Sequence, residues 1–132
     1  MTAPSPGNLQ IAIFGVTGRM GRALLAAIDA APSTVLSGAT ASASSRWLGH
    51  DASEAGGGTK RNVQIVADPA AALSKAQVAI DFTLPEATAA NLAACVAAKC
   101  PLVIGTTGHS EAVRAQIDAA TRSIPIVMAP NM

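Results

Sequence analysis

Charged and aromatic residues are scarce in this sequence. Only 13% of its 132 residues are charged and 2% are aromatic, with no tyrosine, whereas an average soluble protein is roughly 25% charged. Because half of the residues are hydrophobic, the chain can bury enough apolar surface to fold, and a disordered charged tail is excluded. The core must be closed by aliphatic side chains and thirty alanines, which favours small-residue helices packed on a sheet.

Basic stripes and long apolar runs are also missing. The nine basic and eight acidic residues are dispersed, so the chain offers no basic surface of the kind that binds nucleic acid. No apolar run approaches the roughly 20 residues that span a bilayer, and residues 1–8 lack the features of a secretion signal. We therefore expect a cytoplasmic protein of one domain, with a flexible leader over 1–8 and no nucleic-acid or membrane partner.

The few cysteines and histidines form no recognisable site. Cys95 and Cys100 have no CxxC spacing and no histidine cluster, so buried, reduced thiols are expected. His50 and His109 lack partners at metal-ligand spacing, and we predict no metal or catalytic role for either.

Short β-branched runs alternate with helical patterns along the chain. Strands are predicted at 9–14, 34–40, 63–66, 78–82, 101–104 and 124–128, and helices at 19–31, 68–73, 85–99 and 109–122. This alternation predicts a Rossmann-type, doubly wound α/β fold with a mostly parallel sheet and helices on both faces. The Ser- and Gly-rich segment 41–62 is expected to be a long, partly mobile connection. Thr83 and Glu86 have the spacing of a capping box for the helix that follows.

A glycine-rich segment separates the first strand from the first helix. Gly15, Gly18 and Gly21 have the spacing GxxGxxG. Glycines let the backbone turn tightly and approach a pyrophosphate, whose charge the amides at the helix start would bind. The spacing differs from GxGxxG, so a turn that only packs a helix on the sheet remains an alternative.

Two further segments end predicted strands at the same edge of the sheet. Residues 81–83 (Asp-Phe-Thr) close one strand, and residues 105–108 (Gly-Thr-Thr-Gly) follow the next. Because the carboxyl ends of parallel strands meet at one edge, these segments should line one crevice with the glycine turn. Residues 105–108 also fit an ordinary strand-to-helix turn. For Asp81, a carboxylate that accepts backbone hydrogen bonds is favoured over a catalytic group.

Together these segments resemble the dihydrodipicolinate reductase family. Gly15-x-x-Gly18-Arg-Met-Gly21, then residues 81–86, 104–108 and 129–132 (Ala-Pro-Asn-Met), occur in that family's order and spacing. The resemblance covers the family's amino-terminal dinucleotide-binding domain, so 9–132 is expected to be an NAD(P)-binding domain. It implies hydride transfer from NADPH or NADH to the dihydrodipicolinate ring, giving tetrahydrodipicolinate in lysine and diaminopimelate biosynthesis.

The resemblance also assigns residues to the cofactor. It implies contacts to the phosphates and adenosine from Gly15, Val16, Thr17, Gly18, Arg19 and Met20, and contacts beside the ribose and pyrophosphate from Phe82 and Thr83. It implies contacts at the nicotinamide end from Gly105, Thr106, Thr107, Ala129, Pro130, Asn131 and Met132. The family's protonating and substrate-binding residues, and the sheet through which it forms homotetramers, belong to a downstream domain. No catalytic or metal-binding residue is therefore expected in this chain, which alone should be an inactive monomer.

The sequence departs from the family at the end of the second strand. Where the family commonly has an acidic and then a basic residue, this chain has Ala41 and Ser42. An acid there would bind ribose hydroxyls and repel a 2′-phosphate, so its absence predicts that NADPH binds at least as well as NADH. Ser42 and Arg46 are candidate phosphate contacts, although Arg46 fits a solvated loop cation equally well.

Two other functions are compatible with these residues. One is the cofactor domain of another two-domain dehydrogenase of amino-acid metabolism, which would not need both the Arg19-Met20 pair and residues 105–108. The other is a non-catalytic nucleotide-sensing module. The sequence beyond Met132 would separate both from a reductase.

Overall fold

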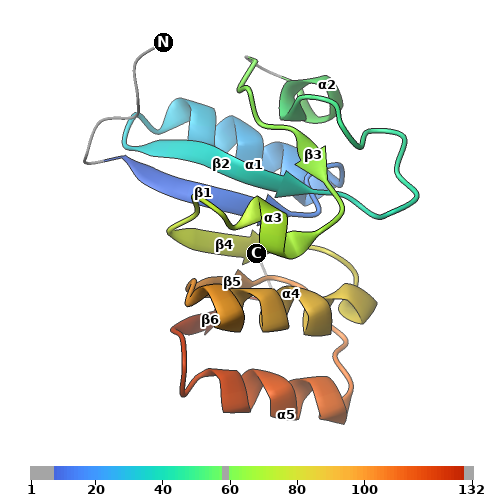
Figure 1. The fold of residues 1–132 in the computed structure, drawn as a ribbon, viewed down its shortest axis with the longest axis vertical. Coiled ribbons are helices and arrows are strands. Elements are labelled where there is room, and N and C mark those ends of the chain that lie inside the picture. The colour runs from blue at the N-terminus through green and yellow to red at the C-terminus, as the bar shows by residue number, and fades with distance from the viewer. Residues whose placement is uncertain (1–7, 58–59, 130–132) are drawn as a thin grey trace.

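A computed structural model describes residues 8–57 and 60–129, which form a six-stranded sheet with helices on its faces (Figure 1). The strands are β1 (Leu9–Phe14), β2 (Thr34–Thr40), β3 (Ile65–Val66), β4 (Val78–Asp81), β5 (Leu102–Ile104) and β6 (Ile126–Met128). The helices are α1 (Arg19–Ala30), α2 (Ala52–Gly56), α3 (Pro69–Ala72), α4 (Pro85–Ala98) and α5 (Glu111–Ala120). Neighbouring strands are all parallel, in the order β3-β2-β1-β4-β5-β6. This is the strand order of doubly wound dinucleotide-binding domains, so the predicted fold is confirmed.

The central strand β1 separates two hydrophobic clusters. Ile11 and Ile13 pack with residues of α1 and α2, whereas Ala12 and Phe14 pack with residues of α3, α4 and α5. Successive side chains of a strand point to opposite faces, so a central strand covered on both sides must be apolar throughout. This explains the unbroken apolar run at the start of the sequence.

The direction in which the chain crosses the sheet reverses between β1 and β4. The chain leaves β1 toward β2 and β3, and it leaves β4 toward β5 and β6 on the other side. The loops after these two adjacent strands therefore diverge at the carboxyl edge of the sheet. Such a switch point leaves a crevice, which is where open α/β sheets bind their ligands.

The segment 41–62 is more ordered than the sequence suggests, within the residues that the structure describes. It contains α2, whose N-cap is Asp51. The Asp51 carboxylate accepts a hydrogen bond from the Ser53 amide at 3.1 Å, and the Glu54 carboxylate accepts one from the Asp51 amide at 2.9 Å. These two bonds form a capping box, so the connection contains a short helix that was not predicted.

The capping box predicted at Thr83 and Glu86 is not formed. The N-cap of α4 is Leu84, which has no side-chain capping bond, and Pro85 opens the helix. The Thr83 hydroxyl donates instead to Asp81 Oδ1 at 2.5 Å. A capping side chain has to accept from the amides of the helix start, whereas this bond holds the Thr83 hydroxyl at the end of β4.

Both cysteines are free and buried, as predicted. Burial raises the pKa of the Cys95 thiol to about 12 and also raises the pKa of the Cys100 thiol. Thiols with raised pKa values are poor nucleophiles. The two side chains therefore act as small core residues of the cluster around α4.

Candidate dinucleotide site

A cavity of about 480 Å³ lies at the switch point. The segments that follow β1, β2 and β4 line it, together with one side of α4 and the start of α3. The end of β2 contributes Thr40, and the three loops contribute Gly15, Thr17, Gly18, Ala41, Ser42, Ala43, Phe82, Thr83 and Leu84. Its volume is in the range of small-molecule sites, roughly 300 to 1,000 Å³. The structure thus brings the glycine turn and the segment after β4 to one crevice, as predicted, whereas residues 105–108, which were expected to line the same crevice, do not line this cavity.

The glycine turn is held by Thr40, at the end of β2, and by Thr83, in the segment after β4. Gly15 has φ +85°, a conformation that side chains disfavour, and its amide donates to the Thr40 carbonyl and hydroxyl oxygens at 3.2 Å each. A Cβ atom on Gly15 would lie 3.0 Å from the Thr83 methyl carbon. The turn is therefore fixed between the ends of β2 and β4.

The start of α1 has features that suit an anion. Its N-cap is Gly18, no side chain makes a capping bond there, and the first turn holds no acidic residue. The first amides of a helix carry partial positive charge and need acceptors. Space is available at Gly18, because a Cβ atom there would lie 3.7 Å from the Gly15 carbonyl oxygen, its nearest non-adjacent neighbour. These observations fit a bound phosphate.

Helix α1 also lies very close to the turn that precedes it. A Cβ atom on Gly21 would lie 2.5 Å from the Gly15 carbonyl oxygen and 2.6 Å from that of Val16. Only glycine fits at this distance. The third glycine of the motif therefore allows the start of α1 to lie directly against the turn.

The segments after β4 and β5 pack on each other. The ring of Phe82 fills the space where Gly105 would carry a side chain, since a Cβ there would be 2.1 Å from the ring. Thr106 is buried, and its hydroxyl donates to the Thr83 carbonyl at 3.0 Å. Asp81 is fully buried beneath them and accepts a hydrogen bond from the Thr83 amide. The non-catalytic interpretation of Asp81 agrees with this position.

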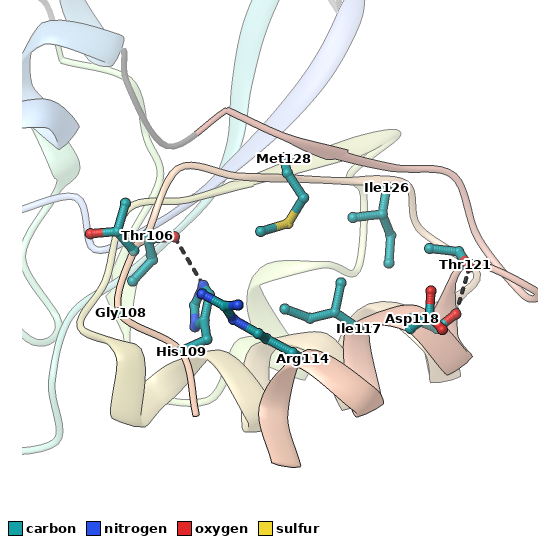
Figure 2. Close-up of a pocket in the computed structure, with 10 residues that line it drawn as sticks. Thr106, Gly108, His109, Arg114, Ile117, Asp118, Thr121, Ile126 and Met128 are labelled. Atoms are coloured by element: carbon teal, nitrogen blue, oxygen red, sulfur yellow. Dashed lines mark hydrogen bonds between the residues drawn. The ribbon is translucent and has the colours of Figure 1, made fainter. Parts of the chain in front are cut away.

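A second cavity, of about 440 Å³, adjoins these loops between α5 and β6 (Figure 2). His109 lies beneath the loop and donates from Nε2 to the Thr106 carbonyl at 2.9 Å. Arg114 extends along the pocket toward His109, and Met128 faces it from β6. Thr107 lines this second cavity and is not among the residues that line the first.

Comparison with known sequences identifies the domain. Residues 9–132 match the family described as "Dihydrodipicolinate reductase, N-terminus". The chain belongs to the dihydrodipicolinate reductase family. It is 45% identical over 122 residues to the 4-hydroxy-tetrahydrodipicolinate reductase of Pseudoalteromonas atlantica, covering 92% of this chain and 46% of that protein. It is 47% identical over 125 residues to that of Thiobacillus denitrificans, covering 95% and 46%. The chain thus spans about half the length of these curated relatives.

Solved structures agree with this family at the level of the fold. A dipicolinate-bound dihydrodipicolinate reductase from Paenisporosarcina superposes with a TM-score of 0.73 at 20% identity, over 94% of this chain and 48% of that one. An amine dehydrogenase from Mycobacterium smegmatis superposes with a TM-score of 0.75 at 18% identity, over 96% and 40%. At these identities the likeness supports the architecture alone.

The residues that the reductase resemblance assigns to phosphate and adenosine lie in different environments. Val16 is fully buried, so its side chain belongs to the core and only its backbone faces the turn. Arg19 is exposed and Met20 is half-buried on the first turn of α1. Ser42 lines the crevice. The Arg46 guanidinium lies 4.9 Å from the centroid of the Trp47 ring and is not among the residues that line the crevice.

The residues assigned to the nicotinamide end are only partly described. The Ala129 amide donates to the Ile104 carbonyl at 2.8 Å, which continues the pairing of β5 with β6. Pro130, Asn131 and Met132 lie outside the described residues.

Two polar residues of the reductase crevice were missed by the sequence interpretation. Thr40 ends β2 and accepts from the Gly15 amide. Asn91, buried on α4, contacts both Asp81 and Thr83. The signal for Asn91 was available, because it is the only amide side chain in an alanine-rich helix.

Among the described residues, no group of His, Cys, Asp and Glu side chains could hold a metal ion. No helix in the same part of the chain has the length and apolarity needed to cross a bilayer. His50 pairs with Glu54 at 3.2 Å on the surface of α2.

Proposed function

We propose that this chain is the dinucleotide-binding domain of a reductase that transfers hydride from NADPH or NADH to the dihydrodipicolinate ring, giving tetrahydrodipicolinate. The observation that carries the proposal is the crevice at the switch point, where the glycine turn faces the segment after β4. Family membership supports the substrate class and the place in lysine and diaminopimelate biosynthesis. The Paenisporosarcina reductase, described as dipicolinate-bound, is consistent with a ring substrate.

In this proposal each segment has a distinct task. The bound nicotinamide would supply the hydride. The amides at the uncapped start of α1 would bind the pyrophosphate, with Arg19 adding positive charge on the same turn. The packed pair of segments after β4 and β5 would form the wall toward the nicotinamide, and Ser42 would lie at the adenosine end.

The absence of an acid near the adenosine end bears on the choice of cofactor. The crevice residues after β2 are Ala41, Ser42 and Ala43, and Ala41 is buried. With no carboxylate among them, a 2′-phosphate meets no repulsion at this point. We therefore propose that the domain binds NADPH at least as well as NADH.

The groups that protonate and bind the substrate would come from the part of the relatives that this chain does not span. The domain over residues 9–132 would then bind cofactor without turning over substrate. We further propose that the chain alone is a monomer, that the full-length enzyme is a homotetramer, and that it works in the cytoplasm.

The first experiment is a calorimetric titration of the 132-residue chain with NADPH and NADH, combined with a coupled reductase assay. We expect binding of both cofactors and no turnover. Gly18→Val should melt close to the wild type, because space is available at Gly18, yet it should lose the thermal shift caused by NADPH. Ala26→Val, at an exposed position of α1, is the matched control and should keep that shift.

Three outcomes would count against the proposal. Absence of binding by the wild type would overturn it. Turnover by the isolated chain would overturn the claim that the essential groups lie elsewhere. A full thermal shift in Gly18→Val would show that Gly18 does not lie at the phosphates.

A further inference from the structure

The buried carboxylate of Asp81 connects three parts of the crevice wall. Its Oδ1 accepts hydrogen bonds from the Thr83 amide at 2.8 Å and the Thr83 hydroxyl at 2.5 Å, and it lies 3.5 Å from the Thr106 hydroxyl. Its Oδ2 accepts from Asn91 Nδ2 at 3.3 Å. The Thr106 hydroxyl gives its single hydrogen to the Thr83 carbonyl, so the carboxylate accepts from three donors, the Thr83 amide, the Thr83 hydroxyl and Asn91, which suits a side chain that only accepts. Asp81 is 0% exposed, so it can act on a ligand only through these partners.

The Thr83 hydroxyl has a single hydrogen, which it donates in a hydrogen bond to the Asp81 carboxylate. The alternative acceptor, the Leu84 carbonyl, is 3.4 Å away, compared with 2.5 Å for the carboxylate. A short bond to a carboxylate is stronger than a long bond to a neutral carbonyl. The direction of this hydroxyl is therefore fixed.

The hydroxyl oxygen of Thr83 can still accept one hydrogen bond from a ligand in the crevice. A hydroxyl oxygen has two lone pairs, and Asn91 Nδ2 donates to one of them at 3.3 Å. Thr83 also lines the cavity. Toward a ligand, this hydroxyl can therefore offer only a lone pair.

We propose that Asp81 is a positioning residue that holds the Thr83 hydroxyl as an acceptor, so that this point of the crevice binds a ribose hydroxyl and disfavours a phosphate oxygen. The inference rests on the proposed function, since it concerns a dinucleotide in this crevice. A ribose hydroxyl has a hydrogen to donate. An ionised phosphate oxygen has none, and it would face both a lone pair and the carboxylate behind it.

The opposite side of the crevice offers the complementary chemistry. At the start of α1, amides without a side-chain cap can donate to an anion. Donors at α1 and an acceptor at Thr83 give the crevice a polarity. A dinucleotide that places its pyrophosphate at α1 and a ribose at Thr83 satisfies both sides, and the reverse placement satisfies neither.

The test measures NADPH affinity for substitutions at Thr83 and Asp81 in the 132-residue chain. Thr83→Val keeps the shape but removes the hydroxyl, and it should weaken NADPH binding by about five- to tenfold, the ordinary cost of one hydrogen bond. Thr83→Ser keeps the hydroxyl and should bind within about twofold of the wild type. Asp81→Asn replaces one acceptor with a donor and should weaken binding by a similar factor to Thr83→Val. The double variant should lose much less than the product of the two single losses, because both changes act on the same bond.

A second probe separates positioning from a general effect on the fold. Inorganic pyrophosphate, measured by competition with NADPH, has phosphate oxygens but no ribose. Its affinity should be the same in the wild type and in Thr83→Val. Asp51→Asn changes a carboxylate with several amide partners outside the cavity, and it should lower the melting temperature while leaving NADPH affinity unchanged.

Each outcome has a defined meaning. NADPH affinity within twofold of the wild type in Thr83→Val would overturn the inference, as would an equal loss of pyrophosphate affinity. The Thr83 variants carry this test if Asp81→Asn fails to fold. A wild type that does not bind NADPH would overturn the proposed function itself, which distinguishes the two failures.

Discussion

The segments that follow β1, β4 and β5 are short and bonded to one another, whereas the segment that follows β2 is long and bonded mainly to itself. In the first group, the Thr106 hydroxyl donates to the Thr83 carbonyl, and Gly15 lies against the Thr83 side chain. In the second, the Asp51 carboxylate accepts from the amides of Ser53, Arg61 and Val63, all within the same stretch of chain.

The difference shows how one crevice can combine a fixed part and a variable part. The first group is built on the ends of central strands, so its geometry is set by the sheet. The second group is stabilised locally and borders the crevice only through its first residues, Ala41 to Ala43. Ser42 and Ala43 are exposed, so their side chains can change without disturbing the sheet.

The largest expected effect is a loss of stability when a side chain is introduced where α1 lies against the glycine turn. Gly→Ala in a helix ordinarily stabilises by about 1 kcal/mol, but a Cβ on Gly21 would lie 2.5 Å from the Gly15 carbonyl oxygen. Gly21→Ala should therefore lower the free energy of unfolding by about 3 kcal/mol, measured by urea denaturation. Gly18→Ala, where space is available, is the control and should change it by less than about 1 kcal/mol. A Gly21→Ala variant that is more stable than the wild type would show that α1 can move away from the Gly15 carbonyl oxygen without loss of free energy.

An intermediate effect is expected when the variable part loses its carboxylate. Burial alone would raise the pKa of Asp51, but hydrogen bonds from the Ser53 hydroxyl and from the amides of Arg61, Ser53 and Val63 lower it from 3.8 to about 2. Because the folded pKa is below the unfolded one, this group stabilises the fold above about pH 4. Because solvent reaches this partly exposed carboxylate and weakens its interactions, the contribution is at most about 1 kcal/mol, and it should disappear as the pH falls from about 4 to 2.

Asp51→Asn checks the origin of this pH dependence. Thermal melts of the variant should be less stable than the wild type at neutral pH and should lose the part of the acid sensitivity that Asp51 supplies. NADPH affinity should not change. The same acid slope in both proteins would place the titrating group elsewhere.

The smallest effect concerns the cation of the variable part. Arg46 is exposed and stacked on Trp47, and exposed ion pairs contribute about 0 to 1 kcal/mol. Arg46→Ala should therefore weaken NADPH binding by about fivefold at most and leave NADH unchanged. For the wild type, NADPH should be favoured by about tenfold or less, with a margin that shrinks in salt.

Dissociation constants for both cofactors at low and high ionic strength provide the check. Arg122→Ala, which removes an exposed cation beyond the end of α5, is the control for net charge. A clear preference for NADH would refute the argument from the missing acid. An unchanged NADPH affinity in Arg46→Ala would show that Arg46 does not bind the 2′-phosphate. The argument from the missing carboxylate would still hold.

The strands and the crevice-facing segments could be predicted because their signals are local. An apolar run that ends at glycine marks a buried parallel strand, and the polar or glycine residues after it mark the sheet edge. The ends of elements depend on distant partners. Strand β3 is limited to Ile65–Val66 because the Val63 amide bonds to Asp51, so the predicted start at Val63 is too early.

The two Ser/Thr/Asp-x-x-Glu patterns show where local interpretation fails. Thr83 and Glu86 have the same spacing as Asp51 and Glu54, yet only the second pair forms a capping box. At Thr83 the hydroxyl donates to Asp81, which holds it at the end of the preceding strand, and the helix begins one residue later with Leu84 as its N-cap. Asn91 was missed for a related reason, since its partners are brought to it by the packing of α4 on the sheet edge.

The bonds that Asp51 accepts also affect how this region opens to solvent. The amides of Ser53, Arg61 and Val63 come from separate turns of the chain, and each donates to this one carboxylate. Hydrogen exchange at an amide requires its bond to break, and regions that open together exchange as one unit. A single rotation of the Asp51 side chain would break the bonds of all three amides at once. These amides should therefore exchange in one common opening event, although they lie apart in the sequence.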